Sequence, residues 1–555
     1  MTDTELAGSR AGSPPGSLAG VRMDAELPLR ADLGLVFNEL DFQLATQVYL
    51  WALPLVSFAQ WQAQHRDVFG ATSYDLVHYA TYQDKLGILT ANATTPYTMA
   101  FIDLNKTGPV LIELPPGPTA GGLSDFWQRE FGILGEMGPD QGRGGRHLIV
   151  PPGQRATAPE GGYAYQSTGM NVFFGFRTLD PDPKRAQALS RAVRITPVDG
   201  RAAPPTRILS PMGRRWSGGP PRGLDYWARL HDIYQHELVD ERDRFYLAML
   251  RQLGIEKGRP FTPGERLTAT LTQAAAAGEL MAQANSFAKR FDGSRYWPDR
   301  QWDLVLPMSN SDQRGDGYDE LLERTSWFYE AVTFSEAMKS QTPGKGQAYL
   351  SAYTDADGNW LDGAASYTLH VPANPPAKLF WSATVYDAAS RCLIDNDQQR
   401  GDRGSRNDDL RREADGSVNL YFDPSAPAGR ESNWVQTIPG RHWFCYVRLY
   451  GPLEPYFDRS WKLGDIHPGT TPQPPRPRRG LASRLYPAGA KCAFGLTLAG
   501  PNAHLGRRGR RAPGLFRVSA GRLHTTMLLS RGHQARRTLM SPWLVRATTA
   551  RGASA

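Results

Sequence analysis

The amino-acid sequence predicts an α+β protein with two jelly-roll-like β-sandwich domains and a helical segment between them. Residues 378–387 alternate with a period of two and are rich in aromatic and β-branched side chains, a pattern typical of a buried strand. Short runs of this kind, separated by Gly, Pro and Asn, recur in residues 75–200 and in residues 345–466. Between these regions, residues 222–341 place apolar side chains at helical spacing, so we expect helices between two β domains.

In chain order, the composition divides the sequence into five segments. Residues 1–37 start with a run rich in Gly, Ser, Pro and Ala, and we expect them to be disordered. Residues 38–215 should hold an N-terminal helix and the first β domain, residues 216–344 a helical domain, and residues 345–466 the second jelly-roll-like β domain. Residues 467–555 form a basic tail, which should be disordered or translated out of frame.

The N-terminal helix is predicted over residues 38–65, with Asn38 as its cap. Its middle, residues 48–56, is apolar on every side, so the helix should be enclosed by protein, and Pro54 should kink it. The most apolar run is far shorter than the ~20 residues that cross a bilayer. Residues 1–40 also lack a secretory leader. We therefore expect a soluble, cytoplasmic protein with no membrane partner.

The positive charge of the chain lies in its tail. The formal net charge is +8, but residues 467–555 contain sixteen Arg and Lys and no Asp or Glu. Of the 63 basic residues, 47 remain in residues 1–466, against 55 acidic ones. The main body is therefore mildly acidic, and nucleic acid is not an expected partner. Our hypothesis is that a chain ending at Ile466 keeps its fold.

The cysteines and short motifs give no strong chemical signature. Cys392, Cys445 and Cys492 form no CxxC pair, so no zinc or redox motif is present. Cys392 and Cys445 fall in predicted strands, where they are either buried free thiols or, if the strands are neighbours, a disulfide. There is no G-x-S-x-G elbow, H-E-x-x-H or Walker loop. The Gly-rich segment 138–147 and the acidic segment 395–409 read as loops, so no metal site is predicted and no cofactor is identified.

Polar residues at predicted strand ends give the candidate site. A histidine with a carboxylate would suit hydrolytic acid–base chemistry, and an arginine would hold an anionic group. The candidate catalytic residues are His370, Asp395 and His442. The candidate ligand-binding residues are Asn92, Thr94, Thr95, Tyr97, Asn396 and Arg441.

Two groups of short motifs stand out along the chain. The first comprises residues 90–98 and 108–115, and the second residues 380–397, 433–437 and 448–452. Together they resemble bacterial proteins made of two tandem domains of unknown function, numbered twelve-fifty-four and twelve-fourteen. The resemblance spans residues 40–466 and implies two jelly-roll-like β domains joined by helices, an oligomer, and no established reaction. Many of these relatives carry an export signal.

The chain departs from this family at one position that bears on chemistry. Many relatives have Asn-x-Asp-Thr where this chain has Asn92-Ala93-Thr94-Thr95. If that aspartate is catalytic in them, its role is missing here.

Two functions follow from these observations. The first is a hydrolase-like enzyme or small-molecule binder with a pocket at the β-domain rims, where loops on a rigid scaffold usually carry ligand groups. The alternative is a non-catalytic structural or assembly protein, since jelly rolls also serve in that way. The expected partners are a small-molecule ligand and further copies of the same chain.

Overall fold

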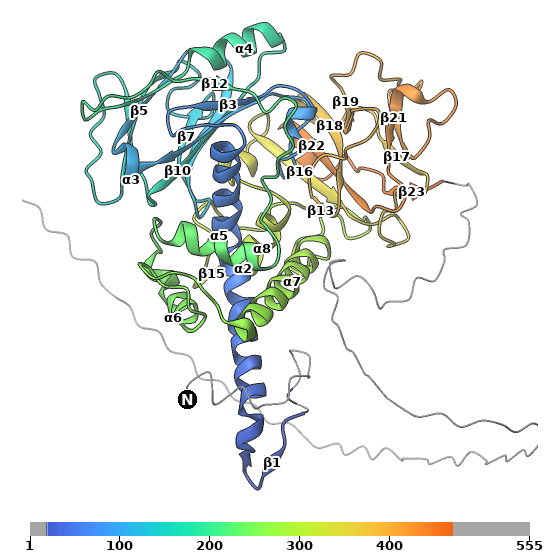
Figure 1. The fold of residues 1–555 in the computed structure, drawn as a ribbon. Coiled ribbons are helices and arrows are strands. Elements are labelled where there is room, and N and C mark those ends of the chain that lie inside the picture. Colours follow the sequence, from blue (N-terminus) through green and yellow to red (C-terminus); the bar gives the residue numbers. More distant parts are fainter. Residues whose placement is uncertain (1–17, 19, 470–555) are drawn as a thin grey trace, which may run out of the picture. The chain divides into compact units, whose positions relative to one another are not determined.

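The computed structural model describes residue 18 and residues 20–469 (Figure 1). Residues 470–555 of the predicted tail and 1–17 of the predicted disordered segment lie outside the described residues. Part of the latter segment is ordered, contrary to the prediction: it forms the hairpin β1 (Met23–Asp24) and β2 (Leu27–Pro28) and the turn η1 (Arg30–Asp32). The reason is local, because the backbone N–H and the guanidinium of Arg22 both donate to the carboxylate of Asp32.

The C-terminal part of helix α2 (Leu33–Asp67) runs through the centre of the protein, and its N-terminal part projects beyond the other helices (Figure 1). The helix begins five residues before the predicted helix and is buried over most of its length, as its apolar middle requires. The segment Arg30–Asp67 is long and apolar enough to cross a membrane by length and composition alone. In the structure 78% of its most apolar window is buried inside the protein, as in the core helix of a globular protein.

Pro54 interrupts the hydrogen bonds inside α2, and another helix compensates. Proline has no N–H and its ring crowds the carbonyl four residues earlier, so the Leu50 carbonyl loses its usual partner. The Arg324 guanidinium donates to the Trp51 carbonyl, and the Thr325 hydroxyl, which is 2.7 Å from the Leu321 carbonyl oxygen of its own helix, also lies 3.2 Å from the Leu50 carbonyl oxygen. The proline therefore anchors α2 to the helix that carries these two side chains.

The helices of the middle segment pack around α2. They are α5 (Leu224–Tyr234), α6 (Arg244–Gln252), α7 (Glu265–Phe287) and α8 (Leu321–Glu330), with the short turns η3 (Glu241–Asp243) and η4 (Glu336–Met338) and the hairpin β14 (Arg314–Gly315) and β15 (Tyr318–Asp319). Gly278 allows α7 to approach α2 closely, because a Cβ at this position would lie 2.4 Å from a ring atom of Tyr49. The helical layer is therefore built on α2 rather than separate from it.

The first β domain consists of two sheets packed face to face. The larger has the order β12-β3-β4-β10-β6-β7 and the smaller the order β11-β5-β8-β9. Their bounds are β3 (Leu76–Tyr79), β4 (Tyr97–Asp103), β5 (Val110–Leu114), β6 (Thr119–Asp125), β7 (Glu130–Gly135), β8 (Gly145–Val150), β9 (Tyr163–Gln166), β10 (Asn171–Thr178), β11 (Arg194–Pro197) and β12 (Ile208–Leu209), with η2 (Gln83–Lys85), α3 (Leu104–Thr107) and α4 (Pro183–Ala192) between them. An aliphatic and aromatic core fills the space between the sheets.

The second β domain has the same two-sheet build. One sheet has the order β13-β16-β22-β18-β19 and the other the order β21-β20-β17-β23. Their bounds are β13 (Asp303–Leu304), β16 (Gln347–Ala352), β17 (Tyr367–Val371), β18 (Ala377–Asp387), β19 (Asp402–Gly404), β20 (Val418–Asp423), β21 (Trp434–Gln436), β22 (Trp443–Pro452) and β23 (Ile466–Pro468), with η5 (Glu431–Asn433) and α9 (Glu454–Phe457). The strand predicted around residues 380–385 is thus confirmed as β18.

Strand β23 extends the second β domain past residue 466, where the sequence predicted that the domain ends. His467 and Pro468, assigned to the tail by the sequence, are paired with Thr368 and Tyr367 of β17. The Gly469 N–H also donates to the Ser366 carbonyl, so the backbone is held through residue 469.

A third hydrophobic core lies between the two β domains. Strand β22 sends Cys445 and Val447 into the core of its own domain, whereas Phe444 and Tyr446 join a central cluster. From the first domain, Met99, Phe101 and Phe173 reach the same cluster, and much of α2 fills it. The fold is therefore α+β, with one large sheet of each domain facing a shared helical core.

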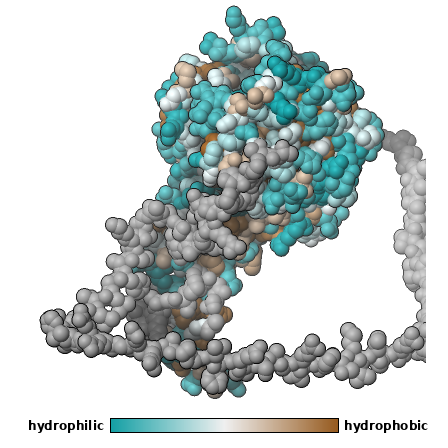
Figure 2. All heavy atoms as spheres, turned by 90° about the vertical axis from the view of Figure 1, so that its right-hand side faces the viewer, coloured by the Kyte–Doolittle hydropathy of each residue, from teal (hydrophilic) through white to brown (hydrophobic). Residues whose placement is uncertain are grey.

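The outer surface is mainly polar where it can be seen. On the face shown in Figure 2, hydrophilic side chains cover most of the described surface and hydrophobic ones are scattered among them. Cys392 and Cys445 are free and buried, so of the two possibilities left open by the sequence the structure has free thiols.

Candidate functional site

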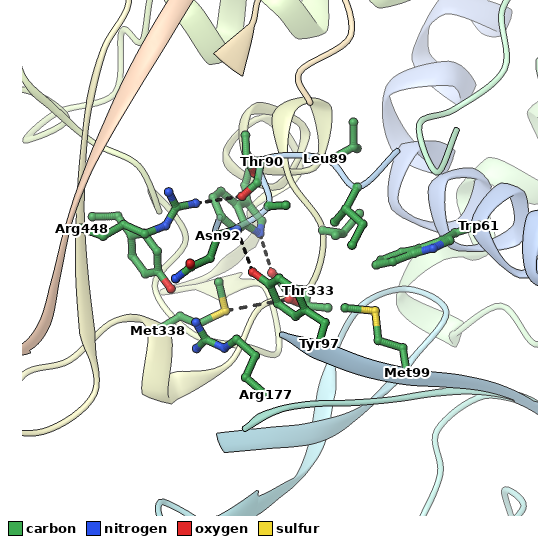
Figure 3. Close-up of a pocket in the computed structure, with 15 residues that line it drawn as sticks. Trp61, Leu89, Thr90, Asn92, Tyr97, Met99, Arg177, Thr333, Met338 and Arg448 are labelled. Carbon is green, nitrogen blue, oxygen red and sulfur yellow. Dashed lines mark hydrogen bonds between the residues drawn. The ribbon is translucent and has the colours of Figure 1, made fainter. Parts of the chain in front are cut away.

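An enclosed pocket lies where the two β domains meet the helical layer (Figure 3). Its volume of about 100 Å³ leaves room for several water molecules or a small anionic group. Its lining comes from α2, β4, β10, β16, β22, α8 and the connections that follow η2 and α8: Trp61, Ile88, Leu89, Thr90, Ala91, Asn92, Tyr97, Met99, Arg177, Trp327, Val332, Thr333, Met338, Tyr349 and Arg448.

Two arginines reach the pocket from different domains. Arg177 comes from β10 of the first domain and Arg448 from β22 of the second, and Asn92 and Tyr97 lie between them (Figure 3). Arg448 is buried and donates to the Thr90 carbonyl over 2.8 Å and to the Tyr386 hydroxyl over 2.5 Å. The fixed hydrogen bonds leave the rest of its guanidinium for the pocket.

Neither guanidinium forms an ion pair within the described part of the chain, and both face tyrosine rings instead. The Arg177 Cζ lies 6.0 Å from the ring centroid of Tyr97 and 5.9 Å from that of Tyr450. The Arg448 Cζ lies 5.4 Å from that of Tyr349. Ring faces attract cations but carry no formal charge. Two positive charges, Arg448 buried and Arg177 half-buried, are costly without a bound carboxylate unless an anion joins them.

Both arginines are positively charged at neutral pH. Burial lowers the pKa of Arg448, but the surrounding tyrosine oxygens raise that pKa more, and the net direction is upward. The pKa of Arg177 follows the same balance, and Arg448 lowers it as a like charge nearby. The pocket therefore carries two repelling cations.

Asn92 adds an unused donor. Its Oδ1 accepts from the Thr94 N–H over 2.6 Å and from the Thr95 N–H over 3.2 Å, which fixes which end of the amide is oxygen. Its Nδ2 is buried and has no hydrogen-bond partner among the described residues. A buried donor left unpaired costs about 1–3 kcal/mol, so it is a natural contact for a ligand oxygen.

Two β-branched residues of the lining adopt strained backbone conformations. Thr90 has φ of +39° and Thr333 has φ of +63°, in the left-handed region that such residues rarely enter. Gln128 holds Thr333 in place: its Oε1 accepts from the Thr333 N–H, while its Nε2 donates to the Pro54 carbonyl of α2. Strain of this kind gathers at binding and catalytic sites, where the surrounding fold enforces it.

A lysine and a carboxylate lie behind the pocket wall. The Lys85 ammonium donates to the Ala93 carbonyl over 2.9 Å, and burial lowers the pKa of Lys85 to about 8. The Thr94 hydroxyl donates to Asp402 over 3.0 Å, and burial raises the pKa of Asp402. Lys85, Arg448 and Arg403 lower the pKa of Asp402, but burial outweighs them, so the charged form of this carboxylate is disfavoured.

The structure brings one group of predicted site residues together. Asn92, Thr94, Thr95 and Tyr97 form one polar turn, in which the Asn92 N–H donates to the Tyr97 hydroxyl over 2.9 Å. Asn92 and Tyr97 line the pocket.

The candidate catalytic residues have partners elsewhere. His370 is exposed on β17 and its Nδ1 is 2.9 Å from Asn419 Oδ1, while the exposed His442 is 3.1 Å from the Leu361 carbonyl. Asp395 is exposed at the end of the turn after β18. Within the described residues no hydrogen bond or ion pair joins any two of these three, and none of them lines the pocket.

Two predicted ligand-binding residues serve the second domain. Arg441 is exposed and pairs with Asp387 over 3.0 Å. The Asn396 amide donates to the carbonyls of Arg400 and Gln436, which closes the loop before β19. Neither lines the pocket.

Sequence reasoning missed the two arginines, although a signal was present. In β22 the face that carries Phe444, Tyr446 and Tyr450 also carries Arg448. An arginine on an otherwise aromatic face of a central strand must be buried with those rings or reach a cavity beside them.

Metal ligation has no support in the described part of the chain. No three His, Cys, Asp or Glu side chains gather there at a spacing that could hold an ion. The donor set of the pocket itself is cationic and amide, which suits an anion rather than a metal.

The fold and the pocket define a protein of two β domains with a cationic cavity at their junction. The family described as protein of unknown function (DUF1254) matches residues 74–197, and protein of unknown function (DUF1214) matches residues 346–454. The chain therefore contains these two domains in tandem. The pocket is shared between them, since Arg177 belongs to the first match and Arg448 to the second.

Two solved structures are similar at low identity. A protein from Vibrio parahaemolyticus shares 17% identity, covers 77% of this chain and 100% of its own, and gives a TM-score of 0.45. An uncharacterized protein from Burkholderia cenocepacia shares 13% identity, with 79% and 96% covered and a TM-score of 0.36. No curated protein matches the chain significantly.

Proposed function

We propose that this protein binds a small organic anion in the pocket between its two β domains. The anionic group is held by Arg177 and Arg448, and an oxygen of it accepts from the Asn92 amide. The observation that carries the proposal is the pair of cationic side chains from two domains with no ion pair among the described residues. A carboxylate offers oxygens to both guanidinium groups, so its binding would offset their repulsion and their desolvation.

Binding of an anion is favoured over the hydrolase-like reaction because of where the acid–base groups lie. A general base must be within hydrogen-bond reach of the reacting group. His370 and His442, the predicted catalytic histidines, are exposed and outside the pocket lining. A hydrolase at this pocket would have to use Lys85 or Tyr97, and Lys85 already donates to a carbonyl.

The experiment is a titration of the full chain with acetate, butanoate, phosphate and sulfate, followed by calorimetry and by thermal unfolding. A bound anion raises the melting temperature with concentration by mass action. In Arg177→Met the affinity should fall about 10- to 100-fold, the value of a hydrogen bond to a charged group. Arg177 is chosen because its side chain faces the Tyr97 and Tyr450 rings and hydrogen-bonds Tyr349, so that no ion pair among the described residues is lost with it.

The matched control is Arg430→Met. Arg430 also stacks on a tyrosine, with its Cζ 4.6 Å from the Tyr421 ring centroid, but it lies outside the pocket. Its replacement should leave anion affinity unchanged. Equal affinities in wild type and Arg177→Met, or no binding of any anion to the wild type, would refute the proposal.

The remaining expectations about the protein belong with this proposal. We infer a jelly-roll-like topology for both β domains, a homo-oligomer and a cytoplasmic location, as the sequence and the family resemblance suggest. A structural or assembly role without a ligand is the alternative function. Light scattering after size exclusion tests the oligomer, and the anion titration separates a binder from a purely structural protein.

A further inference from the structure

A second, larger cavity leads to the pocket from the surface. This cleft has a volume of about 640 Å³, within the range typical of ligand sites. Tyr97, Met99, Arg177, Thr333 and Met338 line both cavities (Figure 3), so the pocket is the inner end of the cleft. A molecule that reached Arg177 from outside would therefore pass through the cleft.

The floor of the cleft is a row of four register partners across the large sheet of the first domain. Met99 of β4 is opposite Gly175 of β10, Gly175 is opposite Gly122 of β6, and Gly122 is opposite Ile133 of β7. All four line the cleft. The two central positions have no side chain of their own, which lets neighbouring groups approach the sheet closely.

Side chains could not be added to this floor without collisions. A Cβ at Gly175 would lie 2.4 Å from the Phe173 ring, and one at Gly122 would lie 2.9 Å from the Gly132 carbonyl oxygen. The space above the two glycines is therefore taken up by the Phe173 ring and the Glu130 carboxyl, and these groups form the floor that a ligand would meet.

The opposite wall of the cleft is aromatic and belongs to the second domain. Phe380 of β18 stacks on Tyr450 of β22, with ring centroids 3.8 Å apart. Arg406 covers the outer face of Phe380, and Arg177 lies beside Tyr450 at the inner end. Burial raises the pKa of Glu130, whose carboxyl lies over Gly122, to about 8, so this carboxyl is mostly protonated at neutral pH.

From this geometry we infer the class of ligand: an organic carboxylate with an elongated apolar body, whose carboxylate enters the inner pocket and whose body lies in the cleft between Met99, Phe173 and Ile133 of the first domain and the aromatic wall of the second. This inference rests on the proposed anion binding at Arg177 and Arg448. It adds that the apolar body, and not only the charged group, is recognised.

The test uses the full chain and a series of straight-chain acids from butanoate to octanoate, with octanamide as the uncharged counterpart. Affinity measured by calorimetry should rise about fourfold for each methylene group that enters the cleft, the value of burying one methylene. Octanamide should bind much more weakly than octanoate, because it lacks the charge that the arginines hold.

Two variants locate the apolar body. Ala337→Trp places a large ring on the cleft lining and should bring octanoate down to the affinity of butanoate, while butanoate itself is unaffected. Ala364→Trp, at an exposed position outside the lining, is the matched control. Leu379→Asn removes an exposed apolar group of the cleft without loading the core, and it should weaken octanoate alone.

The outcomes separate this inference from the proposal beneath it. If butanoate binds in an Arg177-dependent way but longer chains bind no tighter, or if Ala337→Trp and Leu379→Asn leave octanoate unchanged, the apolar body is not recognised and only the anion site stands. If no acid binds, or if octanoate binds equally to Arg177→Met, the anion site falls and this inference falls with it.

Discussion

Replacing Glu330 by Gln should destabilise the protein by about 3–5 kcal/mol, because it leaves a buried ammonium without its carboxylate. The Lys289 Nζ lies 3.7 Å from Glu330 Oε1, and both side chains have 0% exposure. The Lys289 Nζ also donates to the Tyr353 hydroxyl over 2.7 Å, and that hydroxyl donates to both Glu330 oxygens over 2.8 Å. Burial lowers the pKa of Lys289, so its charge depends on this carboxylate.

The double variant Lys289→Met/Glu330→Gln tests the reasoning. Removing both partners leaves no unpaired charge, so it should cost less than the sum of the single variants by about 1–3 kcal/mol. Urea unfolding followed by tryptophan fluorescence and circular dichroism at one pH gives all four free energies. The exposed pair Arg244 and Glu241 is the control and should show no measurable coupling. Additive losses for Lys289 and Glu330 would show that the pair is not coupled.

Three further predictions concern the pocket, a buried carboxyl and the helix packing. Thr333→Gly should gain about 1 kcal/mol of stability in urea unfolding by relieving its left-handed strain, and should weaken anion binding; a loss of stability would contradict the strain argument. Burial raises the pKa of Glu237 from 4.5 to about 7, against four N–H donors, so its contribution to stability is full below pH 4.5 and is lost as pH rises through 7. The free energy of unfolding of the wild type, measured in urea, should therefore fall by about 3 kcal/mol between pH 4.5 and 7, since one pKa unit corresponds to ~1.4 kcal/mol. In Glu237→Gln this dependence of stability on pH should become flatter. Gly278→Ala should cost about 1–3 kcal/mol, seen as a lower melting temperature, because its methyl group overlaps the Tyr49 ring; an unchanged melting temperature would mean that α7 can move away from α2.

Local sequence patterns predicted the strands and helices of this fold well where the burial of an element follows from its own residues. The alternation at residues 380–385 predicts β18 because Trp381, Ala383 and Val385 enter the core of the second domain, while the face with Ser382 and Thr384 is covered as well. The apolar middle of α2 predicts enclosure for the same reason. Pairing across the chain is not encoded locally, so the parallel pairs β8–β9 and β20–β21 could not be foreseen from alternating patterns.

The candidate site was predictable only in part, because it is assembled from both domains. The turn that holds Asn92 and Tyr97 is rich in side chains that bond to their own backbone, and such turns are visible in a sequence. Arg177 and Arg448 are not visible in this way, since an arginine on a strand usually points to solvent. Each becomes a pocket residue only because the other domain covers it.

Because each arginine is covered by the opposite domain, the pocket also affects how firmly the two domains hold together. Arg177 belongs to the first domain and Arg448 to the second. The positive charge of each makes the charged form of the other less favourable. An anion between them would replace a repulsion across the domain junction by two attractions. The strained turn at Thr90 also joins the two domains. The Thr90 carbonyl accepts from Arg448, and the Thr90 N–H donates to the Arg391 carbonyl of the second domain. An anion bound between the two arginines would therefore stabilise the junction by linkage, and opening of the junction would weaken the binding of that anion.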